Sequence, residues 1–158
     1  MGLTRTACAR NLPSPGYYSS NHVLVNRERV FKGLKPLQRC NRLDELAREH
    51  ACKMAIHQHV MPSVATAQEL QIKLKSSRVG ENTLRGTSIR EIHAEMMKCA
   101  QQPACRANVL APRFTRFGMG TALGQDGKLY LVQLFCGEDD LLLKDDKMIR
   151  LEGEPMDV

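Results

Sequence analysis

The sequence predicts an α+β fold in a single domain. Segments with helical periodicity fill most of the first two thirds of the chain, and a glycine-rich pair of alternating segments follows them. Helices and strands do not alternate regularly, as they would in a parallel βαβ sheet. The length of 158 residues fits one domain with a substantial core.

Two helices are indicated in the N-terminal half. The first covers residues 21–32 and ends at Gly33, because glycine readily adopts the left-handed conformation that closes a helix. Residues 34–40 form an irregular crossing. The second helix begins at Asn41, a good N-cap, with Asp44 three residues later as in a capping box. Its apolar face has helical spacing and consists of Leu43, Leu46, Ala47, Ala51, Met54 and Ala55.

Two more helices are indicated after a weakly patterned stretch at residues 61–77. Ser88 and Glu91 form a capping box that opens a helix extending to residue 100. Pro103 suits the first turn of a short helix that ends near Leu110.

An antiparallel hairpin is predicted near the C-terminal end of the domain. Residues 117–123 alternate large side chains with small ones, and residues 128–135 also alternate. The Asp126-Gly127 pair between them is typical of a tight hairpin turn.

Charge divides the chain into a basic body and an acidic tail. The net charge is +6, yet residues 137–158 hold eight acids against three bases, a net of −5, so residues 1–136 carry +11. We expect a flexible arm at residues 1–20 and a folded domain at residues 21–136. A basic body can attract an anionic membrane with the tail as competitor, or the charges simply keep the surface solvated and the tail disordered. Nucleic acid is not an expected partner, because no RNA-binding signature is present.

The cellular compartment is left open by the sequence. No secretory leader and no membrane-spanning stretch is apparent, so the chain is expected inside the cell or at a membrane surface if its start is native, and secreted if a leader is missing. Six cysteines are compatible with disulfides outside the cell or thiols inside.

The first residues fit a lipidation signal. Gly2 and Thr6 match the N-myristoylation pattern, and Cys8 could carry the second acyl chain that stable anchoring needs. Patterns this short also recur by accident, so a plain N-terminus is the alternative.

Four motifs occur in a fixed order along the chain. They are VGEN at residues 79–82, ACRANVL at 104–110, PRFTRFGMG at 112–120 and LYLVQLF at 129–135. Together they resemble the CAP superfamily (the SCP domain of cysteine-rich secretory, antigen 5 and pathogenesis-related proteins), in the bacterial-type pattern VGEN, GHRANIL-NPRFTEIGVG and LYWVQVF. The resemblance spans roughly residues 23–135. It implies a three-layer α-β-α sandwich with a small, mainly antiparallel sheet.

The resemblance also implies a cleft with two histidines and two acids, which bind Zn²⁺ or another divalent ion in several family members. The first acid falls on Glu81 and is retained. The first histidine falls at or beside Pro62, the second acid near Cys99, and the second histidine on Cys105. One position of four is kept, so neither a cofactor nor a metal is expected.

Alternatives remain for the residues at these positions. Glu81, Cys99, Cys105 and His59 could form an improvised zinc site, since thiolate and imidazole are zinc ligands. Cys99 and Cys105 are otherwise small buried groups or a disulfide. Glu81 either caps backbone N–H groups or pairs with Arg106, which is itself a structural anchor or an anion site.

By resemblance, we expect a non-catalytic binding module whose cleft or basic surface takes a lipid, a sterol-like molecule or a protein partner. The cleft candidates are Glu81, Cys99, Cys105, Arg106 and His59. The alternative is a metal-dependent hydrolase with a rearranged site, which the eroded tetrad disfavours because no general base with a partner remains in the motif.

Overall fold

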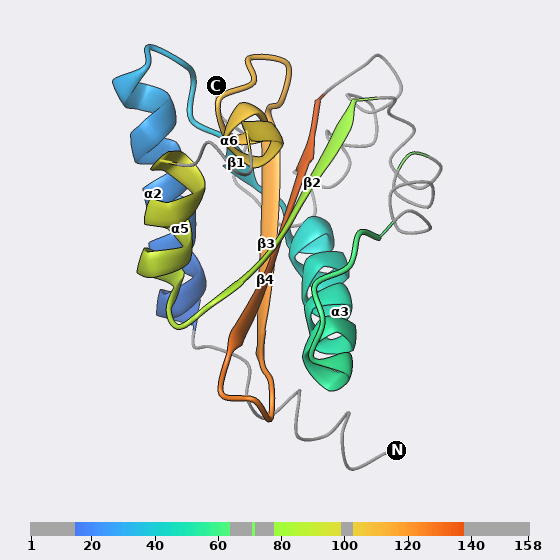
Figure 1. Ribbon diagram of the computed structural model, residues 1–158. Helices are drawn as coiled ribbons and strands as arrows, with labels where there is room; N and C mark the ends of the chain where they lie inside the picture. Colours follow the sequence, from blue (N-terminus) through green and yellow to red (C-terminus); the bar gives the residue numbers. More distant parts are fainter. Residues whose placement is uncertain (1–14, 64–70, 72–77, 99–102, 138–158) are drawn as a thin grey trace.

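The computed structural model describes residues 15–63, 71, 78–98 and 103–137. The N-terminal lipidation signal, most of the expected arm, nearly all of residues 64–77 and the acidic tail beyond Gly137 lie outside the described part. The elements are α2 (Pro15–Phe31), β1 (Gln38–Arg39), α3 (Asn41–His57), β2 (Val79–Gly86), α5 (Ile89–Lys98), α6 (Pro103–Val109), β3 (Arg116–Leu123) and β4 (Leu129–Cys136) (Figure 1). None of the described helices combines the length and apolar character needed to cross a bilayer.

A four-stranded sheet with the order β1-β3-β4-β2 forms the middle of the fold. β3 and β4 are the predicted hairpin, with Leu123 paired to Leu129 and Arg116 to Cys136. β2 runs antiparallel to β4 along its whole length, and the two-residue β1 runs parallel to β3. The sheet is therefore mainly antiparallel, as predicted.

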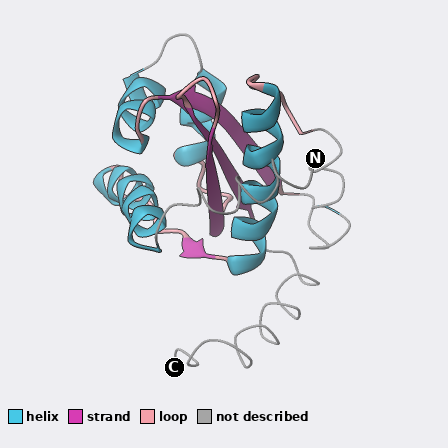
Figure 2. Ribbon diagram, turned by 90° about the horizontal axis from the view of Figure 1, so that it is seen from below, coloured by secondary structure: helices cyan, strands magenta, loops and turns pink. Residues whose placement is uncertain are grey.

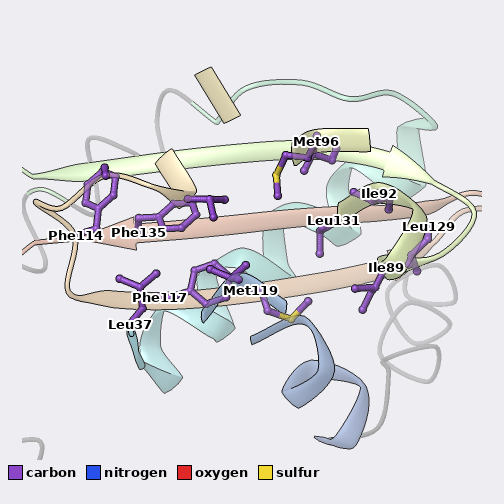
Figure 3. Packing of buried hydrophobic residues seen from close by; sticks show 14 residues of the cluster. Leu37, Ile89, Ile92, Met96, Phe114, Phe117, Met119, Leu129, Leu131 and Phe135 are labelled. Atoms are coloured by element: carbon purple, nitrogen blue, oxygen red, sulfur yellow. The ribbon is translucent and has the colours of Figure 1, made fainter. Parts of the chain in front are cut away.

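Helices cover both faces of this sheet, which confirms the α-β-α sandwich (Figure 2). The side chains of β4 alternate between the two faces, as a strand requires. Tyr130, Val132 and Leu134 pack with α3, whereas Leu129, Leu131 and Phe135 belong to the core covered by α2, α5 and α6. In this second core Phe135 lies between Phe114 and Phe117, with ring centroids 5.4 and 5.0 Å away (Figure 3).

Glycines in β3 let α3 lie directly on the sheet. A Cβ atom built on Gly118 would collide with the backbone of Leu43 and Asp44, and one on Gly120 with the backbone of Arg48. The alternation of large and small residues that predicted this strand is thus also what sets the helix–sheet distance.

The end of α2 is as expected, and the start of α5 keeps half of the predicted capping box, because the Glu91 carboxylate accepts from the N–H and hydroxyl of Thr87 rather than from the Ser88 N–H. Gly33 has a φ of 76°, and the Leu34 N–H donates to the Arg29 carbonyl, which closes α2 in a left-handed cap. The Ser88 hydroxyl accepts from the Glu91 N–H at 3.1 Å and caps α5.

Three expectations about local structure were wrong. α2 begins at Pro15, six residues before the expected start. Cys40, rather than Asn41, is the N-cap of α3, and its side chain makes no capping bond. The Asp44 carboxylate instead accepts from the Met119 N–H at 3.0 Å and from Arg39 Nε at 2.8 Å, so it ties the helix to the sheet. Residues 79–86, where the sequence shows the VGEN motif but no predicted strand, form a full strand.

Candidate functional site

The Glu81 side chain lies on the α3 side of the sheet. Glu81 pairs with Leu134 across the β2–β4 ladder, and paired residues point to the same face. One carboxylate oxygen accepts a hydrogen bond from the Ser63 N–H at 2.8 Å. The other oxygen is buried and has no hydrogen-bond partner within the described residues. The carboxylate therefore caps a backbone N–H group, one of the two structural roles expected for it.

A buried amide network lies on the opposite face of the sheet. Asn82 is 1% exposed, and its Nδ2 donates to Gln133 Oε1 and to the Cys105 carbonyl, both at 3.0 Å. Asn108 Nδ2 donates to Asn82 Oδ1 at 2.9 Å, and Gln133 Nε2 donates to Asn21 Oδ1 at 3.4 Å. The network joins β2, β4, α6 and α2.

Asparagine side chains often bond backbone groups within turns, and this is the role that the sequence favours for Asn82 and Asn108. The contacts correct that expectation. Both asparagines cross-link separate elements. Gln133 was missed altogether, although a lone amide inside the apolar segment 129–135 was a visible signal, because a buried amide needs hydrogen-bond partners.

Arg29 holds the segment that carries α6 in place. Its side chain is 1% exposed and donates to four backbone carbonyls rather than to a carboxylate of the described chain. Nη1 donates to Val109 and Ala111 at 2.8 Å each, Nη2 to Phe114 at 3.2 Å, and Nε to Lys35 at 2.9 Å. Val109 ends α6, so the guanidinium satisfies a helix-terminal carbonyl that has no partner within its own helix. Hydrophobic periodicity could not reveal this role, because the buried face of α2 carries polar residues.

The structure places two of the proposed cleft residues, Glu81 and Cys105, on opposite faces of the sheet. Cys105 is a half-buried thiol that packs into the core covered by α2, α5 and α6, so the sheet separates it from the Glu81 carboxylate. Arg106 is exposed on α6 and His59 is exposed after α3. One Glu81 oxygen accepts from the Ser63 N–H and the other has no hydrogen-bond partner among the described residues, so the alternative hydrogen-bonded pair with Arg106 is not seen there. Cys99 lies outside the described residues, as do Gly2 and Cys8.

The disulfide alternative for Cys105 is not realised, because this residue remains a thiol. Cys40 and Cys136 are thiols as well, whereas Cys52 on α3 is disulfide-bonded.

Three histidines of the described chain serve structural contacts. The position of His50 on the apolar face of the second predicted helix favours a hydrogen-bonded core histidine, and the structure confirms it, with Nε2 2.8 Å from the Met61 carbonyl. His93 contacts Glu28 at 2.9 Å, a partner that the sequence did not reveal. His22 Nε2 lies 3.2 Å from the Leu37 carbonyl, and burial lowers the pKa of this imidazole.

Two further features of the described residues, their possible metal ligands and a polar groove, limit the chemistry that they can perform. No three His, Cys, Asp or Glu side chains in this part of the chain are close enough together to hold a metal ion. An open polar groove of about 290 Å³ lies at the start of α3 and is lined by Arg39, Asn41, Asp44, Glu45 and Arg48. Its charges are balanced, since Arg39 and Asp44 form an ion pair at 2.8 Å.

Solved structures with the same fold come from several organisms. An outer surface protein of Borrelia burgdorferi is 14% identical with a TM-score of 0.70, over 81% of this chain and 98% of that protein. An extracellular SCP-domain protein of Bacillus anthracis is 20% identical with a TM-score of 0.64, over 78% of this chain and 41% of that one. Manganese-bound Ac-ASP-7, an Ancylostoma-secreted protein, is 17% identical with a TM-score of 0.55, over 81% and 72%. At these identities the likeness shows the fold alone.

A comparison with curated proteins finds no match. The model of the cysteine-rich secretory protein family, CAP, matches residues 23–135, which is most of the chain and includes β2, α6 and the β3–β4 hairpin. The chain therefore belongs to the CAP family.

Proposed function

We propose that this CAP domain is a non-catalytic binding module, whose cleft or basic surface takes a lipid, a sterol-like molecule or a protein partner. One observation carries the non-catalytic part of the proposal. The retained tetrad acid, Glu81, bonds the Ser63 N–H, and the sheet separates it from Cys105 at the second histidine position. A single carboxylate binds zinc weakly, because protein zinc sites use three or four imidazole, thiolate or carboxylate ligands. No such group of three occurs among the described residues.

The alternative is a metal-dependent hydrolase with a rearranged site. It is favoured by the second Glu81 oxygen, which is buried without a described hydrogen-bond partner, and by the manganese named in the structure of Ac-ASP-7. This oxygen could accept a cation if further ligands approached it.

Metal titration separates the two functions. We expect isothermal titration with Zn²⁺ and Mn²⁺ to give the same weak heats for the wild-type chain and for Glu81→Gln, which keeps the shape and an oxygen acceptor for Ser63. Thermal melts should agree, since a metal at 100 times its Kd would add about 2.7 kcal/mol to stability. Sub-micromolar binding that disappears in Glu81→Gln would establish the metal site instead.

Vesicle co-sedimentation tests the lipid part of the proposal. The wild-type chain should co-sediment with vesicles of phosphatidylcholine that also contain phosphatidylserine or sterol, with no divalent metal added. If all of the protein stayed in the supernatant with every vesicle composition, the lipid part of the proposal would be wrong. A protein partner would then be the remaining ligand class.

A further inference from the structure

One face of α2 exposes apolar side chains to solvent. Val23 is 51% exposed, Val30 58% and Phe31 83%. Their separations of seven and eight residues place them on the same side of a helix with 3.6 residues per turn. The opposite side carries Asn21, Val25 and Arg29, all at most 1% exposed. Single exposed apolar residues are ordinary, but these three share one helix face and are called the apolar stripe below, although the exposed Arg27 separates Val23 from Val30 and Phe31.

Phe31 projects at the end of the helix. It is the last residue of α2, and the left-handed cap at Gly33 turns the chain back immediately after it. The chain returns toward the core through Lys35, whose carbonyl is held by Arg29. The turn is thus fixed, and the aromatic ring stands out from it.

Basic residues surround this apolar stripe. Arg27 lies within it, and Lys32 and Lys35 follow it, all exposed. Arg113, another exposed base, lies between Ala111 and Phe114, whose carbonyls accept from Arg29. The segment between α6 and β3 lies at the same end of the molecule as the end of α2 (Figure 1). Among the described residues the exposed acids lie on α3, on the neighbouring α5 and in the β3–β4 turn: Glu45, Glu49, Glu91, Glu95 and Asp126. The acid within the described part of α2, Glu28, is partly buried and paired with His93.

We propose that this face of α2 docks on a phospholipid bilayer that carries anionic headgroups, with Phe31 inserted at the interface. Apolar side chains next to flexible cationic ones are typical of helices that lie at a membrane surface. The long stems of lysine and arginine let their charges reach the headgroups while the apolar stripe enters the boundary region. The inference rests on the lipid part of the proposed function and assigns it to one surface.

The same charges disfavour a second copy of this chain as the occupant. A two-fold contact across the stripe would place the basic residues of one copy opposite those of the other copy. Like charges that face each other across an interface are repulsive, whereas an anionic membrane is complementary to all of them.

Vesicle binding of matched variants tests the proposal. Phe31→Ser removes the inserted ring, and Lys32→Glu with Lys35→Glu reverses the adjacent charge. The control is Leu123→Ser, which changes a 48% exposed apolar residue at the last position of β3, the opposite end of that strand from Arg116. All four positions are exposed, and thermal melts verify that every variant folds.

We expect Phe31→Ser to weaken partitioning into vesicles with phosphatidylserine by about tenfold or more, and Leu123→Ser to leave it unchanged. The double charge reversal should weaken binding by a similar factor and flatten its salt dependence. Binding by Phe31→Ser equal to that of the wild type would overturn the proposal while leaving the proposed function intact. A wild-type dimer in solution that Phe31→Ser dissociates, with vesicle binding unchanged, would assign the face to a protein contact.

Discussion

At the residue scale, the position of the family motif depends on buried polar side chains that bind backbone carbonyls. Arg29 supplies four such donors from α2, and three of the accepting carbonyls lie between Val109 and Phe114. Burial lowers the pKa of this guanidinium, and no carboxylate of the described chain pairs with it to offset the cost. The hydrogen bonds must therefore stabilise the buried charge. The carbonyls depend on the guanidinium in turn, because no water reaches them to donate in its place.

Replacement of Arg29 is expected to destabilise the whole domain. Arg29→Met leaves several buried carbonyls without donors, at about 1–3 kcal/mol for each group, so the free energy of unfolding should fall by more than about 3 kcal/mol. Arg29→Lys should recover only part of the loss, because an ammonium cannot reproduce the planar fork. Urea unfolding measures the free energy of unfolding of both variants. The control is Arg27→Met on the exposed side of α2, expected to change stability by less than about 0.5 kcal/mol, and an equal effect of the two Met substitutions would contradict the role of Arg29.

At the scale of elements, the closest helix–sheet contact is that between α3 and β3. It is possible only because Gly118 and Gly120 present no side chain to the helix backbone. A methyl group there would force the helix away from the sheet and disturb the packing of the β4 residues beneath α3.

Gly120→Ala should therefore destabilise the domain by roughly 3 kcal/mol, since overpacking against rigid backbone typically costs about 1–3 kcal/mol or more. Gly127→Ala is the comparison, because Gly127 has open space around it but a φ of 78°. Alanine at that φ costs about 1–2 kcal/mol from backbone strain alone. If thermal melts ranked Gly127→Ala as the more damaging change, close packing would not be the reason for glycine at residue 120.

Prediction from sequence succeeded where a signal is local. The stop at Gly33 and the hairpin around Gly127 are each encoded within a few residues, and both are present. Ser88 caps α5 as predicted, but the Glu91 carboxylate bonds Thr87, so only half of the capping box forms. β2 was missed because its residues were interpreted as a family motif rather than as an alternating strand. The assignment of Asn41 as N-cap was wrong because Asp44 forms tertiary bonds to Arg39 and Met119, which no local pattern contains.

At the scale of the whole molecule, the sheet decides which motif residues meet. The VGEN and ACRANVL motifs do come together, through Asn82 and Asn108. Glu81 is next to Asn82 in sequence but points to the other face, since successive strand residues alternate. Motif order in the sequence therefore predicted the fold, while the composition of the candidate site depended on strand register, which could not be read from the motif itself.

The stability of the fold should also depend on pH through His22, which lies between three parts of the molecule. It belongs to α2, contacts the Leu37 carbonyl before β1, and its ring centroid lies 5.2 Å from that of Phe117 in β3. Burial is the main reason that its pKa is below the usual 6.5, and Arg39 lowers it further, while the Leu37 carbonyl and Asp44 act in the opposite direction. Between the lowered folded-state pKa and pH 6.5, the unfolded chain thus binds more protons at this residue than the folded chain does.

Neutral His22 makes its full contribution to the free energy of unfolding above pH 6.5. This contribution is lost as the pH falls from there through the lower, folded-state pKa. The slope in this window is at most about 1.4 kcal/mol per pH unit for one proton. Urea unfolding of the wild type and of His22→Gln between about pH 7.5 and 5 measures it. As the pH falls, the free energy of unfolding of the wild type should decrease relative to that of His22→Gln. The subtraction cancels the contributions of all groups that the two proteins share. A difference that stays constant over the whole range would mean that burial of His22 does not couple the fold to pH.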